Sequence, residues 1–308
     1  MSARYAFLGP EGTFAHAAAQ RLAGSSETVL VPYATVTQAI DALHAGLVDA
    51  TVVPLENSVE GAVPATLDAL AGDELLMIVA ETFLPVVFDL MARSGTRQQD
   101  VRTIATHPHA EAQVRRYLLS ELPEATVALV GSTAGGAQAV SEGRYDAAVA
   151  PVISAGLYGL QSLAHDIADN SGAVTRFVLL SAPRQPPPPT GNDRTTLVTY
   201  LRDDHAGALL QILTEFASRG INLTRIESRP TKGRIGDYCF SIDCEGHIGE
   251  ARVADALAAL HRACASVRYL GSYRREDGNQ SPVGAGHTDP DFAGAARWLA
   301  SIREHGTA

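Results

Sequence analysis

Hydrophobic and polar positions along the chain switch repeatedly between the period of a strand and the period of a helix. In the N-terminal part this pattern predicts a strand at 4–8, a helix at 13–23, a strand at 28–32, a helix at 35–45 and a strand at 49–53. Strands that alternate with helices favour parallel sheets with right-handed crossovers. The pattern therefore predicts an α/β protein.

A second block of the chain repeats the first. When the chain is aligned with itself at an offset of 97 residues, residue 42 is matched with residue 139. The matching patterns are Ala42-x3-Gly46-x2-Asp49-Ala50-x-Val52-x-Pro54 and Ala139-x3-Gly143-x2-Asp146-Ala147-x-Val149-x-Pro151. At the same offset Tyr5–Leu8 falls on Arg102–Ala105. We therefore expect two lobes that face each other across a cleft, with 74–92 and 172–181 as the extended segments that cross between them.

A proline-rich segment divides the chain into two domains. We expect a first domain at 1–183, a linker at 184–193, a second domain at 194–273 and a tail at 274–308 with a short helix at 292–302. The second domain is predicted to contain strand 195–202, helix 206–219, strand 222–231, strand 236–245, helix 249–264 and strand 266–273. This βαββαβ order is ferredoxin-like.

The composition of the chain argues against several classes of function. The 308 residues are 46% hydrophobic and carry a net charge of −10, from 24 basic and 34 acidic residues, which argues against a general nucleic-acid or anionic-membrane binder. Lys232 is the only lysine and lies in the turn-like run from Thr231 to Arg234, which argues against P-loop, Schiff-base and pyridoxal-phosphate chemistry. A bound anion therefore has to be held by arginine, hydroxyl, amide or backbone N–H groups.

The cysteines and the N-terminal residues indicate the cellular compartment of the protein. Cys239 and Cys244 are five residues apart in a predicted strand and so face opposite sides, and with Cys264 they form neither a disulfide framework nor a zinc motif. Met1 leads directly into a strand, without the pattern of a signal peptide or a membrane span. We expect a reduced, cytoplasmic protein.

The carboxyl ends of the predicted strands are the expected ligand positions in an open α/β sheet. They are Gly9–Thr13, Pro54–Gly61, Thr106–Gln113 and Pro151–Gly156. Backbone N–H groups after Gly9 would hold a carboxylate, or Thr13 is simply an N-cap. Likewise Asn57 and Ser58 either contact a ligand or cap the next helix.

Two further motifs have competing interpretations. His107 and His109 flank Pro108 and lack a paired carboxylate or cysteine motif, which argues against a metal site and favours Thr106 and Gln113 as hydrogen-bonding groups. The run Thr175-Arg176-Phe177 is, by composition alone, an ordinary part of a strand.

Taken together, the separated motifs resemble the prephenate dehydratase family, and the C-terminal part resembles its regulatory ACT domain. The motifs are Phe-Leu-Gly-Pro-Glu-Gly-Thr-Phe (7–14), Glu-Asn-Ser-Val-Glu-Gly (56–61), His-Pro-His-Ala-Glu-Ala-Gln (107–113), Ser-Thr (132–133), Tyr-Gly-Leu (158–160), Thr-Arg-Phe (175–177), Gly-Ala-Leu-Leu (207–210) and Asn-Leu-Thr-Arg-Ile-Glu-Ser-Arg-Pro (222–230). Ala173 and Val114 depart from the residues that family members often have there, namely Asn and Cys. No chorismate mutase helix precedes Tyr5, so the chain looks monofunctional.

The resemblance implies a duplicated, two-lobed catalytic domain similar to periplasmic binding proteins, followed by an ACT domain. The implied reaction converts prephenate to phenylpyruvate, water and carbon dioxide without a metal or other cofactor. By resemblance Thr175 is the catalytic hydroxyl at the leaving oxygen, and Glu56 is the competing acid. Substrate binding is assigned to Glu56, Asn57, Ser58, Thr106, Gln113, Arg176 and Phe177.

The resemblance also implies feedback regulation by L-phenylalanine, bound between the ACT domains of a homodimer or homotetramer. N–H groups near Gly207, Ala208 and Leu209 would take its carboxylate. Asn222 would contact the amino acid beside Leu223, with Glu227 and Ser228 next to the pocket. No nucleic acid or membrane partner is expected.

Three alternatives stay open. A two-lobed chain is also typical of solute-binding proteins, although the absence of a signal peptide and the ACT-like domain argue against that class. An amino-acid-responsive transcription regulator would need a helix-turn-helix and a basic face. Within the enzymes, an arogenate dehydratase is the nearest alternative.

Overall fold

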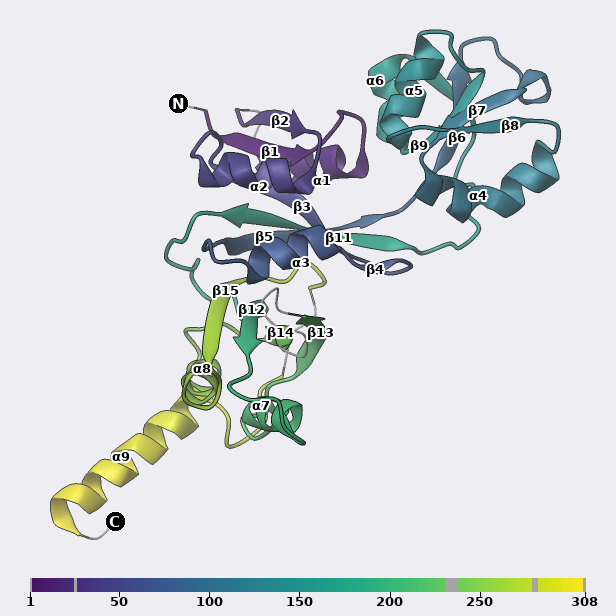
Figure 1. The fold of residues 1–308 in the computed structure, drawn as a ribbon. Helices are drawn as coiled ribbons and strands as arrows, with labels where there is room; N and C mark the ends of the chain where they lie inside the picture. Colours follow the sequence, from purple (N-terminus) through teal and green to yellow (C-terminus); the bar gives the residue numbers. More distant parts are fainter. Residues whose placement is uncertain (1, 25–26, 231–237, 279–281, 307–308) are drawn as a thin grey trace. The chain divides into compact units, whose positions relative to one another are not determined.

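The computed structural model describes residues 2–24, 27–230, 238–278 and 282–306, and their strands form three sheets (Figure 1). Lys232 and the run Thr231–Arg234 lie outside the described residues. The chain forms two compact units. The first consists of Met1–Thr66 and Thr82–Leu180, and the second of Leu67–Glu81 and Ser181–Ala308.

The first lobe is built on a mixed sheet. Its strand order is β2 (Val29–Tyr33), β1 (Arg4–Leu8), β3 (Ala50–Asn57), β11 (Val174–Ser181) and β5 (Met77–Pro85), and β4 (Gly61–Ala62) also pairs with β3. The strands β2, β1 and β3 are parallel as predicted, whereas β11 is antiparallel to β3. The helices of this part of the chain are α1 (Phe14–Ala23), α2 (Val36–His44) and α3 (Pro64–Ala71).

The second lobe repeats this arrangement and confirms the duplication. Its strand order is β10 (Leu160–Ala164), β6 (Asp89–Arg93), β9 (Ala147–Ala150), β7 (Thr103–Thr106) and β8 (Thr126–Leu129). The parallel set β8-β7-β9 corresponds to β2-β1-β3, and β6 runs antiparallel to β9. The helical segments are η1 (Gln98–Asp100), α4 (Pro108–Glu121), α5 (Thr133–Ser141) and α6 (Val152–Tyr158). Both sheets are mixed rather than purely parallel because the chain crosses between lobes twice, from β5 to β6 and from β10 to β11.

The turn that follows the second helix of each lobe shows the repeat at atomic detail. Gly46 and Gly143 have φ of 68° and 82°, in the left-handed region that favours glycine. The Gly46 N–H donates to the Leu43 carbonyl, and the Gly143 N–H donates to the Val140 carbonyl, both at 3.0 Å. The repeated glycine therefore ends the helix in the same way in both lobes.

Strand β9 shows why this part of the sequence is almost continuously apolar. Ala147 and Val149 pack into the core beneath α4, while Ala148 and Ala150 pack into the core beneath α5 and α6. Successive residues of a strand point to opposite faces, and here helices cover both faces.

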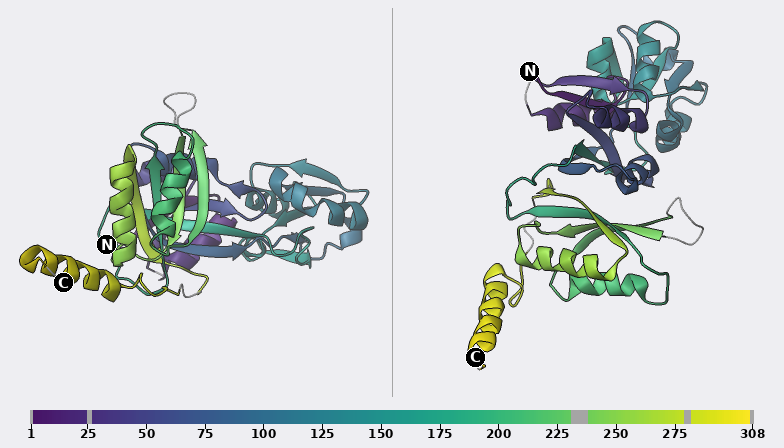
Figure 2. Two further views of the ribbon diagram at one scale, coloured as in Figure 1. Left: turned by 90° about the horizontal axis from the view of Figure 1, so that it is seen from below. Right: turned by 60° about the vertical axis from the view of Figure 1, so that its left-hand side comes forward.

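The sheet of the second unit has the predicted βαββαβ order. Its strand order is β13 (Leu223–Pro230), β14 (Tyr238–Glu245), β12 (Asp193–Tyr200) and β15 (Ser266–Arg274). The helices α7 (Ala208–Ala217) and α8 (Ala251–Ala263) lie together on one face (Figure 2). Cys239, Cys244 and Cys264 are buried free thiols, and Cys244 packs in the core under the helices.

The segment Leu67–Glu81 packs within the second unit, a feature that the sequence pattern did not predict. Gly271 on β15 has φ of 130°, and a Cβ atom there would lie 2.2 Å from the Ile78 carbonyl oxygen on β5. Only glycine allows this approach.

The C-terminal helix α9 (Asp289–His305) is longer than the predicted helix at 292–302. Thr288 at the N-cap and Asp291 in the first turn form a capping box, and Gly306 ends the helix with φ of 74°. These capping signals extend the helix beyond its apolar positions. Among the described helices, none has the length and apolarity that crossing a membrane requires.

Candidate active site between the two lobes

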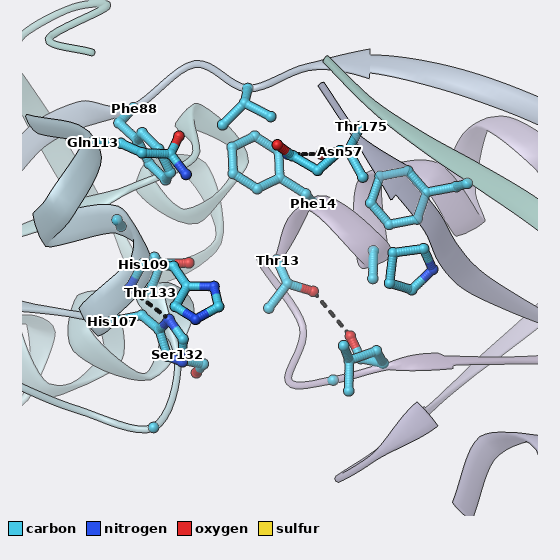
Figure 3. Close-up of a pocket in the computed structure, with 18 of the residues that line it drawn as sticks. Thr13, Phe14, Asn57, Phe88, His107, His109, Gln113, Ser132, Thr133 and Thr175 are labelled. Atoms are coloured by element: carbon cyan, nitrogen blue, oxygen red, sulfur yellow. Dashed lines mark hydrogen bonds between the residues drawn. The ribbon is translucent and has the colours of Figure 1, made fainter. Parts of the chain in front are cut away.

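A cavity of about 300 Å³ lies between the two lobes of the first unit (Figure 3). It is lined by residues from three of the four strand-end segments that the sequence selected, namely Gly9–Thr13, Pro54–Gly61 and Thr106–Gln113. The fourth, Pro151–Gly156, supports the first. Ser154 Oγ donates to the Gly12 carbonyl at 2.8 Å.

Three helices begin at the wall of this cavity. Thr13 caps α1, His107 caps α4 and Ser132 caps α5, and each side chain accepts a backbone N–H of its own helix. All three caps line the cavity. Because a helix N-terminus carries a partial positive charge, three of them create a favourable place for an anion.

The described residues that line the cavity include no Asp, Glu, Lys or Arg. His107 and His109 are the titratable groups of this lining, and their rings meet edge to face with centroids 5.0 Å apart. Burial is the main cause that lowers the pKa of His107, and the nearby His109 acts in the same direction. A neutral His107 ring at pH 7 fits its cap, because its Nδ1 accepts the His109 N–H at 3.3 Å.

Asn57 and Thr175 form a hydrogen-bonded pair at the first-lobe wall. They are directly opposite in the antiparallel register of β3 and β11, and Asn57 Nδ2 donates to Thr175 Oγ1 at 2.8 Å (Figure 3). Asn57 Oδ1 accepts the N–H groups of Val59 and Glu60 at 2.8 and 3.0 Å, which fixes the orientation of the amide. Since the Thr175 oxygen accepts from Asn57, its proton is available for a ligand.

Aromatic rings form the apolar part of the lining. Phe14 on α1 meets Phe88 edge to face, with centroids 5.5 Å apart, and Phe177 on β11 lines the same cavity. Phe88 follows β5 in the segment that crosses between the lobes. The cavity thus suits a ligand with an unsaturated ring and anionic groups.

The residues expected to bind substrate separate into two groups. Asn57, Gln113 and Phe177 line the cavity together with Thr175, whereas Glu56, Ser58, Thr106 and Arg176 are absent from its described lining. Strand periodicity explains the position of Glu56 and Arg176. They pair with each other in the register and point away from the face that carries Asn57 and Thr175, with 3.8 Å between Arg176 Nη1 and Glu56 Oε2.

Ser58 and Thr106 instead hold the main chain in place. Ser58 Oγ accepts the Val174 N–H at 2.9 Å, beside the start of β11. Thr106 is fully buried and donates to the Val149 carbonyl at 2.9 Å. Both therefore connect strands at the edge of the site.

The sequence did not predict a role in the site for several residues that line the cavity, among them Thr13, Phe14, Phe88, His107, His109, Ser132 and Thr133. The available signal was a polar N-cap directly after a predicted strand, as at Thr13 and Ser132. That signal is equally typical of an ordinary helix start. Among the described residues no group of three His, Cys, Asp or Glu is arranged to hold a metal ion.

The residues expected to bind phenylalanine all lie in the second unit. Gly207, with φ of 91°, precedes α7, and no side chain caps the first turn at Ala208 and Leu209. Asn222 directly precedes the edge strand β13, on which Leu223 and Glu227 are partly buried and Ser228 is exposed. These positions are consistent with a helix-start site for a carboxylate.

Comparison with known proteins gives two family matches. A model of the prephenate dehydratase family matches residues 5–185, and a model of the ACT domain matches residues 195–262. A curated prephenate dehydratase of Amycolatopsis methanolica is 47% identical over 301 residues, covering 97% of this chain and 98% of the relative.

Two solved structures extend the comparison. The structure of a prephenate dehydratase from Arthrobacter aurescens in complex with L-Phe is 47% identical, with a TM-score of 0.91 and coverage of 98% of this chain and 99% of the other. A structure described as GqqA, a quorum quenching acylase, is 33% identical, with a TM-score of 0.80 and coverage of 89% and 98%.

Proposed function

Because the chain belongs to the prephenate dehydratase family, we propose that it converts prephenate to phenylpyruvate, water and carbon dioxide in the interlobe cavity. The electron pair of the ring–carboxylate bond moves into the ring as carbon dioxide leaves, and the ring expels its hydroxyl group. That group takes up one proton and departs as water. Aromatisation of the ring drives the reaction, so the proposal involves no metal or other cofactor.

The observation that carries the proposal is the Asn57–Thr175 pair. Asn57 donates to the Thr175 oxygen, and this directs the Thr175 proton toward a ligand. A hydroxyl that already accepts a hydrogen bond is a better donor, because consecutive hydrogen bonds polarise each other. Thr175 therefore stabilises the negative charge that develops on the departing oxygen.

The cavity wall supplies what a dianionic, cyclic substrate needs. The starts of α1, α4 and α5 offer N–H groups and partial positive charge to the two carboxylates. Gln113 adds a side-chain amide, while Phe14 and Phe177 contact the ring. Fixing the carboxylates and the ring holds the leaving groups in a reactive orientation.

Thr175 is the better candidate than Glu56 for assisting the leaving hydroxyl. Glu56 lies next to Asn57 on β3 but faces the opposite side of the sheet, where it contacts Arg176. We assign Glu56 and Arg176 to support of the β3–β11 pairing, and Ser58 and Thr106 to positioning of the main chain.

The lining also favours prephenate over arogenate. Arogenate carries an ammonium group in place of the ketone of prephenate, and the described lining offers no carboxylate to pair with it. We expect purified protein to release phenylpyruvate and carbon dioxide from prephenate in equal amounts, and to act on arogenate at least tenfold more slowly, since an unpaired buried charge is costly. The proposed reaction is wrong if the protein forms no phenylpyruvate from prephenate.

Three of the four hydroxyls in the described lining give no support to acylase chemistry, although one structural neighbour carries that description. Hydrolysis by an activated hydroxyl requires a base within hydrogen-bond reach of the nucleophile. Here Thr13 donates to the Leu8 and Pro10 carbonyls, Ser132 accepts the Gly135 N–H, and Thr175 accepts from Asn57. Each of these hydroxyls is thus engaged with a neutral group.

We further propose feedback inhibition by L-phenylalanine, bound in the ACT domain between two subunits. The start of α7 at Gly207 and the residue Asn222 are separated by the whole of α7, which is about 15 Å long for its 10 residues. A single amino acid does not span that distance, so a second copy of the chain has to bring the two groups together. The exposed side chains of Leu210 and Ile226 fit such a homo-oligomeric interface, as a dimer or tetramer.

Asn222→Ala is expected to weaken L-phenylalanine binding by about tenfold, because one hydrogen bond to a charged ligand is lost. Titration calorimetry of the full chain measures the binding, and prephenate turnover with and without L-phenylalanine measures inhibition. Asn192, an amide on the chain before β12, gives a matched Asn192→Ala control. Unchanged binding in Asn222→Ala would remove this residue from the effector site.

The proposed cellular location is the cytoplasm. Cys239, Cys244 and Cys264 are buried as free thiols, which suits a reducing compartment. Burial raises the pKa of the Cys239 and Cys264 thiols, so both remain protonated and unreactive at neutral pH.

A further inference from the structure

Glu60 connects the two walls of the cavity without lining it. It lies in the turn between β3 and β4 in the first lobe. Its carboxylate reaches α4 in the second lobe, where Oε1 accepts from Gln113 Nε2 at 2.9 Å and Oε2 lies 2.8 Å from His109 Nδ1. The carboxylate thus contacts two cavity residues of the opposite lobe at once.

The position of the two partners on α4 makes the contact specific. His109 and Gln113 are four residues apart, so they lie on the same face of the helix, one turn from each other. A carboxylate has two oxygens that accept hydrogen bonds in one plane, and Glu60 uses one for each partner. Separation of the lobes therefore breaks both contacts together.

The backbone of Glu60, in contrast to its side chain, contacts the first-lobe wall of the cavity. Its N–H donates to Asn57 Oδ1, the oxygen whose engagement turns the amide of Asn57 toward Thr175. One residue thus joins the Asn57–Thr175 pair in the first lobe to Gln113 and His109 in the second. Its contacts are complete only when the lobes are closed.

From this geometry we infer that Glu60 is a positioning residue that holds the two lobes closed over the substrate and sets the orientation of Gln113 and His109. This role rests on the proposed reaction. The Glu60 side chain is 39% exposed, so water screens its contacts and their contribution is a shift of the open–closed equilibrium. The affinity for a substrate that binds the closed form falls in proportion to the closed fraction.

The inference is tested by steady-state kinetics of Glu60→Ala, Glu60→Gln and the control Glu124→Ala in the full chain. Glu60→Ala is expected to raise KM for prephenate by about tenfold with kcat within about twofold, because the backbone N–H to Asn57 remains. Glu60→Gln keeps an acceptor for Gln113 and is expected to restore KM to within about threefold. Glu124 is an exposed carboxylate after α4, so Glu124→Ala removes the same charge elsewhere and should leave both constants unchanged.

Hydrogen exchange without substrate gives an independent readout. The amides at the start of α4 should exchange severalfold faster in Glu60→Ala than in the parent protein, with an unchanged Tm. Unchanged KM and exchange, or a fall in kcat alone, would overturn the inference while the parent protein still turns over prephenate. If the parent protein does not turn over prephenate, the proposed reaction fails, and the exchange experiment still decides the role of Glu60.

Discussion

Thr175→Val is expected to lower kcat for prephenate by about 10²-fold or more and to change KM only modestly. Valine has nearly the same shape as threonine, so the variant keeps the packing of β11 but loses the donor at the departing oxygen. Removal of one donor that acts on developing charge in an enclosed site typically costs 10²- to 10³-fold in kcat. Steady-state formation of phenylpyruvate measures the effect.

Thr175→Ser is the matched control because it retains the hydroxyl that accepts from Asn57. We expect its kcat to remain within about tenfold of the parent value, since only a methyl group is lost. A Thr175→Val variant with near-parental kcat would exclude Thr175 from the mechanism and leave Glu56 as the competing acid.

Glu81→Gln is expected to lower the free energy of unfolding of the second unit by about 3–5 kcal/mol, because it leaves the Arg194 charge buried without its partner. The Glu81 side chain is fully buried on β5, and Arg194 on β12 donates to it within the same unit. Arg194 Nε is also buried without a hydrogen-bond partner in the described part of the chain. In thermal unfolding the loss corresponds to a drop in Tm of roughly 10–20 °C.

Two further variants test this explanation. The double variant Glu81→Leu with Arg194→Met replaces both charges by apolar groups and should recover most of the lost stability, since a well-packed apolar pair avoids the cost of burying charge. Asp100→Asn removes the partner of Arg97 in an exposed pair and should leave Tm unchanged. Equal losses in Glu81→Gln and in the double variant would show that packing, not charge pairing, decides the stability.

Much of the secondary structure followed from local pattern. The parallel strands β1, β2 and β3 lie within one residue of the predicted starts, and the repeat at an offset of 97 predicted β7, β8 and β9 from them. Apolar periodicity is a local property, so it can be read from the sequence without knowledge of the tertiary structure. The sequence also predicted the crossing segments 74–92 and 172–181, which include β5, most of β6 and β11. The antiparallel pairing of β6, β10 and β11 depends instead on contacts between distant parts of the chain, which no local pattern contains.

The candidate site was predicted at the level of segments, and only partly at the level of side chains. The rule that ligands bind beyond the carboxyl ends of strands selected the loops that contain Thr13, Asn57 and Gln113. Glu56 and Asn57 were both expected to bind substrate, but alternation along β3 places them on opposite sides of the sheet. Which side meets the cavity depended on the register that pairs Asn57 with Thr175.

The sequence by itself determined the two-lobed α/β plan, the βαββαβ module, the family and the scarcity of lysine, which leaves arginine, hydroxyl, amide or backbone N–H groups to bind an anion. The tertiary structure alone decided that three helix starts meet at one cavity, that Leu67–Glu81 packs with the second unit, and that Glu60 reaches across to α4. The physical reason is the distance along the chain over which each kind of interaction acts. Periodicity and capping act over a few residues, whereas a site formed between lobes depends on contacts between residues that are far apart in the chain.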